Sequence, residues 1–66
     1  MKVIVIDRES LYELCTTSMD ILPDVGDTLN IGELHSNITW TQVVKKEWVV
    51  ANGRESYVAI VVKIRQ

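Results

Sequence analysis

The sequence is poor in the residues that cross-link small proteins. Its 66 residues include one cysteine, Cys15, and one histidine, His35. A single cysteine excludes an intramolecular disulfide, and the two residues together supply only half of the four ligands that a structural zinc site needs. Because so short a chain has a small core, this lack favours a partner subunit as reinforcement.

The same scarcity argues against catalysis. A hydrolytic site needs a nucleophile beside a base, with a third group that orients the base. The neighbours of His35 are polar and typical of an exposed loop, and Cys15 stands near Glu13 and hydroxyl residues, which do not favour a thiolate. We therefore expect no enzyme, no catalytic residue and a buried structural role for Cys15.

Glycine and proline are also scarce, with three Gly and one Pro. The glycines stand singly, so no glycine-rich loop is available to hold a phosphate-bearing cofactor. Asp20, Asp24, Asp27 and Glu33 lack the alternating spacing of a calcium loop, and turn formation accounts for them. We expect no cofactor and no metal ion.

Long apolar runs are missing as well. The N-terminal run ends at Asp7, too early for a signal-peptide core, and no stretch approaches the length of a membrane span. A lone cysteine fits a reducing compartment. We expect a cytoplasmic protein without membrane contact, folded as one domain over residues 1–66.

The chain does contain many β-branched residues. Residues 2–6 have the pattern of a strand with little water on either face, and residues 11–21 favour a second strand that completes an N-terminal hairpin. The alternative is an α+β fold, in which Ser10 and Glu13 cap a short helix over residues 10–20. The β-branched and hydroxyl residues that follow disfavour that helix.

The rest of the chain has clearer turn signals. Residues 23–27 (Pro-Asp-Val-Gly-Asp) predict a turn, followed by a short strand at 28–31. Strand-type runs at 38–50 and 56–65 flank Asn52-Gly53, a strong hairpin signal. We predict a mostly β fold, a small antiparallel meander or an SH3-like, partly open barrel of about five strands.

The alternation of apolar and polar residues in the two long runs predicts which side chains face the core. A three-residue loop, residues 51–53 with Gly53 left-handed, keeps Lys45 and Glu47 out of the core, although Lys46 still has inward parity and implies a bulge or an open end. The predicted core face is Trp40, Val44, Trp48, Val58, Ile60, Val62 and Ile64. The opposite face is unusually apolar, so we expect the N-terminal segment or another subunit to cover it. This predicted partner surface consists of Val43, Val49, Tyr57, Ala59 and Val61.

The turn at residues 23–27, followed by Thr28-Leu29, Trp40-x-x-Val43 and Trp48, resembles a type of uncharacterised small bacterial and phage protein. Those proteins have an N-terminal hairpin, a P-x-V/I-G-D/E turn and a final β-branched strand. The resemblance spans about the last two-thirds of the chain. It implies a compact meander or small barrel and no activity.

Charge is distributed unevenly along the sequence. Residues 1–36 carry two basic and seven acidic side chains, a net charge of −5, whereas residues 37–66 carry five and two, a net charge of +3. A basic hairpin with nearby aromatic residues is one way to bind single-stranded nucleic acid. Its predicted contacts are Lys45, Lys46, Arg54, Lys63 and Arg65.

Three functions remain open at this point. The preferred one is a non-enzymatic protein-interaction or accessory module that self-associates. The first alternative is a nucleic-acid-binding small barrel, against which stand the net charge of −2 and the predicted burial of both tryptophans. The second is a phage-type inhibitor of a host protein.

Overall fold

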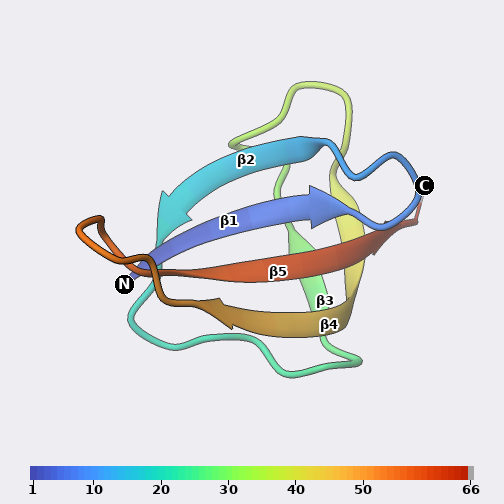
Figure 1. Ribbon diagram of the computed structural model, residues 1–66. Coiled ribbons are helices and arrows are strands. Elements are labelled where there is room, and N and C mark those ends of the chain that lie inside the picture. Colours follow the sequence, from blue (N-terminus) through green and yellow to red (C-terminus); the bar gives the residue numbers. More distant parts are fainter. Residues whose placement is uncertain (66) are drawn as a thin grey trace.

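The computed structural model describes residues 1–65, and over that range the chain forms one five-stranded sheet with no helix (Figure 1). The strands are β1 (Lys2–Asp7), β2 (Glu13–Ser18), β3 (Thr28–Asn30), β4 (Trp40–Val49) and β5 (Tyr57–Ile64). Their order in the sheet is β2-β1-β5-β4-β3. The sheet curls into an open half-barrel, which confirms the predicted fold class and the N-terminal hairpin.

One pairing in the sheet is parallel. β1 lies between β2, with which it forms the hairpin, and β5, beside which it runs in the same direction. The first and last strands therefore hold the centre of the sheet together. Val3 and Val5 point to the inner face and are fully buried, whereas Ile4 and Ile6 alternate to the outer face. Within residues 1–65, no helix is long and apolar enough to cross a membrane.

The core fills the inner side of the half-barrel. Val58, Ile60 and Val62 of β5 are fully buried there, as predicted. The buried cluster contains Val3, Val5, Val43, Val58, Ile60 and Val62, with Leu14, Cys15, Met19, Leu22 and Leu29 packed against it. Thr41 is also fully buried, and its hydroxyl donates to the Leu29 carbonyl at 2.8 Å, which satisfies its polar atom.

A β-bulge in β4 overturns part of the predicted core. Val43 pairs with Val62 and Lys45 with Val61, so Val44 is an extra residue without a partner. The extra residue reverses the alternation of the N-terminal half of β4. Val43, predicted on the outer face, is 1% exposed in the core, and Trp40, predicted inside, is 50% exposed.

The C-terminal half of β4 keeps the predicted parity but not the predicted loop. Trp48 pairs with Val58 and shares its face, yet it is 58% exposed because it lies at the open end of the half-barrel. β4 ends at Val49 and β5 begins at Tyr57, so the connection is residues 50–56 rather than a three-residue loop. Gly53 does adopt the predicted left-handed conformation, with φ of 72°.

The Pro-Asp-Val-Gly-Asp turn forms as predicted and is attached to β4. Gly26 has φ of 97°, and its N–H donates to the Val43 carbonyl at 2.8 Å. The Val43 N–H donates in return to the Asp27 carbonyl at 2.9 Å. A carboxylate oxygen of Asp27 also accepts the Asp24 N–H at 2.8 Å. These bonds set the start of β3 beside β4.

Candidate interaction surfaces

The outer face of the sheet carries an apolar patch that extends over three strands. Ile4 and Ile6 of β1 lie beside Ala59 and Val61 of β5, and directly paired residues share a face. The outer-face patch consists of Ile4, Ile6, Val49, Tyr57, Ala59 and Val61. Four of the five residues predicted as a partner surface are therefore present, while Val43 is absent and two isoleucines of β1 are added.

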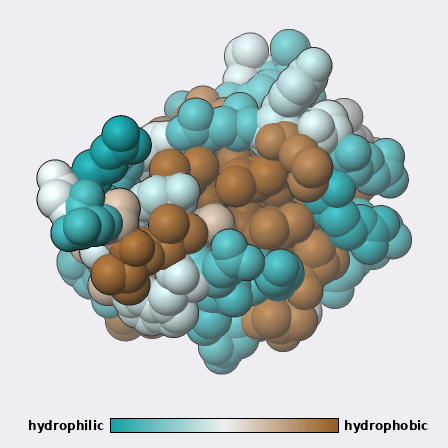
Figure 2. Space-filling model, in the orientation of Figure 1, coloured by the Kyte–Doolittle hydropathy of each residue, from teal (hydrophilic) through white to brown (hydrophobic). Residues whose placement is uncertain are grey.

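The outer-face patch is not covered by another segment of residues 1–65. The N-terminal segment lies beside β5 as β1, so it widens the face instead of covering it, contrary to one of the two expectations. Figure 2 shows hydrophobic surface gathered over the middle of this face, where β1 and β5 cross the front of Figure 1, with hydrophilic residues around it. All the patch residues except Ala59 are partly exposed.

Opposite charges flank the patch. Glu13 of β2 pairs with Ile6, and Lys45 of β4 pairs with Val61, so one row across the outer face runs from acid through two apolar residues to lysine. The Lys45 ammonium lies 3.2 Å from a carboxylate oxygen of Glu47 on the same strand. The row is therefore apolar at its centre and charged at both ends.

The five basic residues predicted to contact nucleic acid do not form one cluster. Lys45 lies at the edge of the outer-face patch, and Lys46 points to the inner side, with its ammonium 3.4 Å from a carboxylate oxygen of Asp24. Arg54 belongs to the connection between β4 and β5. Lys63 and Arg65 lie together at the opposite end of β5 from Arg54, and Lys45, which pairs with Val61, is a diagonal neighbour of Lys63 on the same face.

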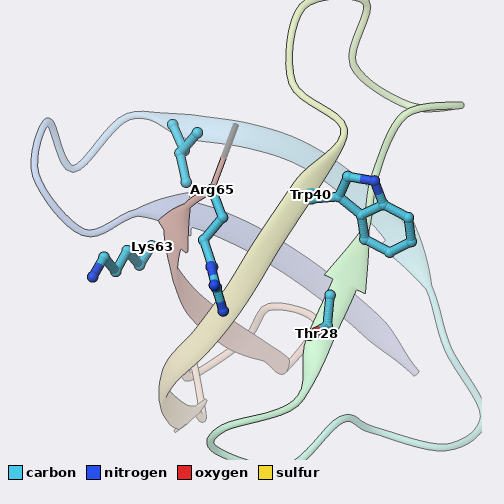
Figure 3. Close-up of a pocket in the computed structure, with 5 residues that line it drawn as sticks. Thr28, Trp40, Lys63 and Arg65 are labelled. Carbon is cyan, nitrogen blue, oxygen red and sulfur yellow. The ribbon is translucent and has the colours of Figure 1, made fainter.

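Lys63 and Arg65 line an open groove of about 670 Å³ across β3, β4 and β5. Its lining is Thr28, Trp40, Lys63, Ile64 and Arg65. In Figure 3 the two basic side chains lie on one side of the β4 ribbon, and Trp40 and Thr28 lie on the other. Sequence reasoning missed Trp40 here because it counted strict alternation through the bulge.

Neither Cys15 nor His35 is arranged as a nucleophile or base. Burial raises the pKa of the Cys15 thiol, and the nearby negative charge of Glu13 raises it further, so the neutral form is favoured at pH 7. His35 lies in the loop before β4, where its Nδ1 accepts the Asn37 N–H at 3.2 Å. In residues 1–65 no three His, Cys, Asp or Glu side chains are grouped to hold a metal ion.

No family model, curated protein or solved structure matches this chain. The resemblance to small bacterial and phage proteins therefore stays a prediction.

Proposed function

We propose that this protein is a non-enzymatic interaction module that self-associates through the outer-face patch. The observation that carries the proposal is the continuity of the patch. Ile4 and Ile6 of β1 lie against Ala59 and Val61 of β5, and no segment of residues 1–65 covers them. A solvent-facing sheet surface normally alternates to polar residues at such positions. Burial of this surface against a second copy removes apolar area from water.

The charges at the edges of the patch favour a second copy as the occupant. A two-fold axis parallel to the strands would stack Ile6 of one subunit on Val61 of the other. The same rotation brings Glu13 close to the partner subunit's Lys45, and Lys45 close to the partner subunit's Glu13. One row of the sheet thus supplies both halves of a self-complementary contact.

The shape of the sheet limits the strength of this contact. The patch lies on the convex side of a curled sheet, so the apolar contact between two copies is mainly along β1 and β5, with the Glu13 and Lys45 pairs at its edges (Figure 1). Small interfaces of this kind are at the weak end of specific association. We expect a dimer with a dissociation constant on the order of 10–100 µM, about −5.5 to −7 kcal/mol.

Sedimentation velocity over roughly 1–500 µM, a range that brackets this affinity, tests the proposal. We expect the wild type to shift from monomer to dimer and the Val61→Lys variant to remain monomeric. Val50→Lys is the matched control, because Val50 is 83% exposed and lies outside the patch. Far-UV circular dichroism checks that each variant is folded.

A charge exchange makes the test specific to the two-fold arrangement. Glu13→Lys places like charges together across the proposed interface and should weaken the dimer several-fold. Adding Lys45→Glu to Glu13→Lys should restore it. A folded wild type that stays monomeric throughout the concentration range overturns self-association, and failure of the double variant to recover overturns this orientation.

A further inference from the structure

The groove between Trp40 and Arg65 has a different character from the outer-face patch. Arg65 follows β5 directly and its N–H donates to the Trp40 carbonyl at 2.9 Å, which extends the β4–β5 ladder and sets the two residues side by side. Thr28 and Lys63 both pair with Gln42, one from each neighbouring strand. An aromatic ring, a hydroxyl and two cations therefore share one surface.

We infer that this groove binds a short segment of single-stranded nucleic acid, with one base stacked on the Trp40 indole and neighbouring phosphates on Lys63 and Arg65. Trp40 is 50% exposed, although a tryptophan of a small domain would gain from full burial. Figure 3 shows the Arg65 side chain directed along β4 and not over the indole, which leaves the ring free for a base. Any of the bases can stack on an exposed aromatic ring, so such a site has little sequence preference.

The local charge supports an anionic ligand despite the net charge of −2. Over residues 1–65 neither Lys63 nor Arg65 forms an ion pair, in contrast to Lys45 and Lys46, which do. The acidic residue next to Thr28 is Asp27, and one of its carboxylate oxygens accepts a backbone N–H within its own turn. Within residues 1–65, the groove thus places two basic side chains that form no ion pair beside an exposed tryptophan.

The volume of the groove fits a nucleotide unit. About 670 Å³ is within the range of pockets that hold small organic ligands, and the groove is open, so a chain can enter and leave it. Two cations correspond to two phosphate contacts. For single strands this predicts a slope of about −1.4 for the logarithm of affinity against the logarithm of salt concentration, or roughly a sevenfold loss between 50 and 200 mM salt.

Fluorescence titration with a twelve-nucleotide oligothymidylate tests the inference. The protein has two tryptophans, so a Trp48→Phe background leaves Trp40 as the only indole. We expect the oligonucleotide to quench this fluorescence in a saturable, salt-sensitive manner. Titration below about 5 µM protein, under the expected dimer dissociation constant, keeps the result independent of self-association.

Three variants distinguish binding in the groove from non-specific electrostatic attraction to basic residues. The binding of each variant is measured by the fluorescence anisotropy of the labelled oligonucleotide. Arg65→Gln should lower affinity several-fold and reduce the salt slope to about −0.7, whereas the matched control Arg54→Gln, at the other end of β5, should change neither. Trp40→Ala should weaken binding about tenfold or more through lost stacking. If Trp40→Ala is unfolded, the Arg65 and Arg54 pair decides the question.

A comparison with thymidine monophosphate distinguishes a nucleic acid from a free nucleotide. We expect the mononucleotide to bind at least tenfold more weakly than the oligonucleotide, because it offers one phosphate instead of several. Equal affinity of the two ligands would overturn the assignment to a nucleic-acid strand. Absence of quenching, or equal effects of Arg54→Gln and Arg65→Gln, would overturn the groove as the binding site.

Discussion

The exposure of Trp48 predicts that its loss destabilises the protein less than the loss of a smaller, buried side chain. Ile60 is fully buried at the centre of β5, between Val5 of β1 and Lys46 of β4. Trp48 is 58% exposed at the end of the half-barrel. We therefore expect Ile60→Ala to destabilise the protein more than Trp48→Ala, although the second change deletes a much larger side chain.

The magnitudes follow from burial. Removal of a fully enclosed isoleucine leaves a cavity and costs about 3–4 kcal/mol. A fully enclosed tryptophan buries about 250 Å², so a ring that is 58% exposed hides about 100 Å², worth at most roughly 2.5 kcal/mol. Because the unfolded chain also hides part of this area, about 1–2 kcal/mol is expected.

Urea unfolding followed by far-UV circular dichroism measures both costs without dependence on tryptophan fluorescence. A domain of this size has a total stability of about 3–10 kcal/mol, so Ile60→Ala should remove a large part of it. At an m-value near 1 kcal/mol/M, the Trp48→Ala midpoint should fall by about 1–2 M. A loss for Trp48→Ala that equals or exceeds that for Ile60→Ala would refute the reasoning, because it would place the indole in the core.

Two further predictions concern the N-terminal hairpin. Leu11 is 73% exposed and has a φ of 64°, so Leu11→Gly should raise the free energy of unfolding by about 0.5–1 kcal/mol because it relieves left-handed strain. Leu11→Ala keeps a Cβ and should not raise it. Urea unfolding measures both variants, and equal effects would exclude strain as the cause. The raised pKa of Cys15 keeps its thiol protonated at pH values where a free cysteine begins to ionise. At about pH 8 iodoacetamide should therefore alkylate the folded protein more slowly than the urea-unfolded chain, as followed by mass spectrometry, and equal rates would contradict a shielded thiol.

Local chemistry was enough to predict most of the fold. The Asn52-Gly53 signal and the alternation of Val58, Ile60 and Val62 identified β5, its partner strand and its buried face. The β-branched and hydroxyl residues of β2 correctly outweighed the Ser10–Glu13 capping pattern, because a helix would have needed them in its interior. These signals come from neighbours in sequence, so no tertiary information was needed.

The parts that sequence did not predict depend on contacts between distant strands. The parallel pairing of β1 with β5 joins the two ends of the described chain, and it is what brings Ile4 and Ile6 beside Ala59 and Val61. Nothing in the local pattern of either strand specifies that neighbour. The sequence indicated an apolar outer stripe on β4 and β5, but the extent of the patch follows from the sheet order.

The bulge at Val44 explains the errors in the predicted core and also determines which residues lie on the two proposed surfaces. Without the extra residue, alternation would place Trp40 inside and Val43 outside. The core would then have to enclose an indole in place of the fully buried Val43. The groove would lose its stacking surface, and the outer-face patch would extend along β4 toward Lys63. A bulge also bends its strand, which turns the Trp40 half of the outer face away from the half that carries the patch. The inward parity of Lys46 did not signal this feature: Lys46 follows the bulge, keeps its predicted inner face opposite Ile60, and places its ammonium 3.4 Å from a carboxylate oxygen of Asp24.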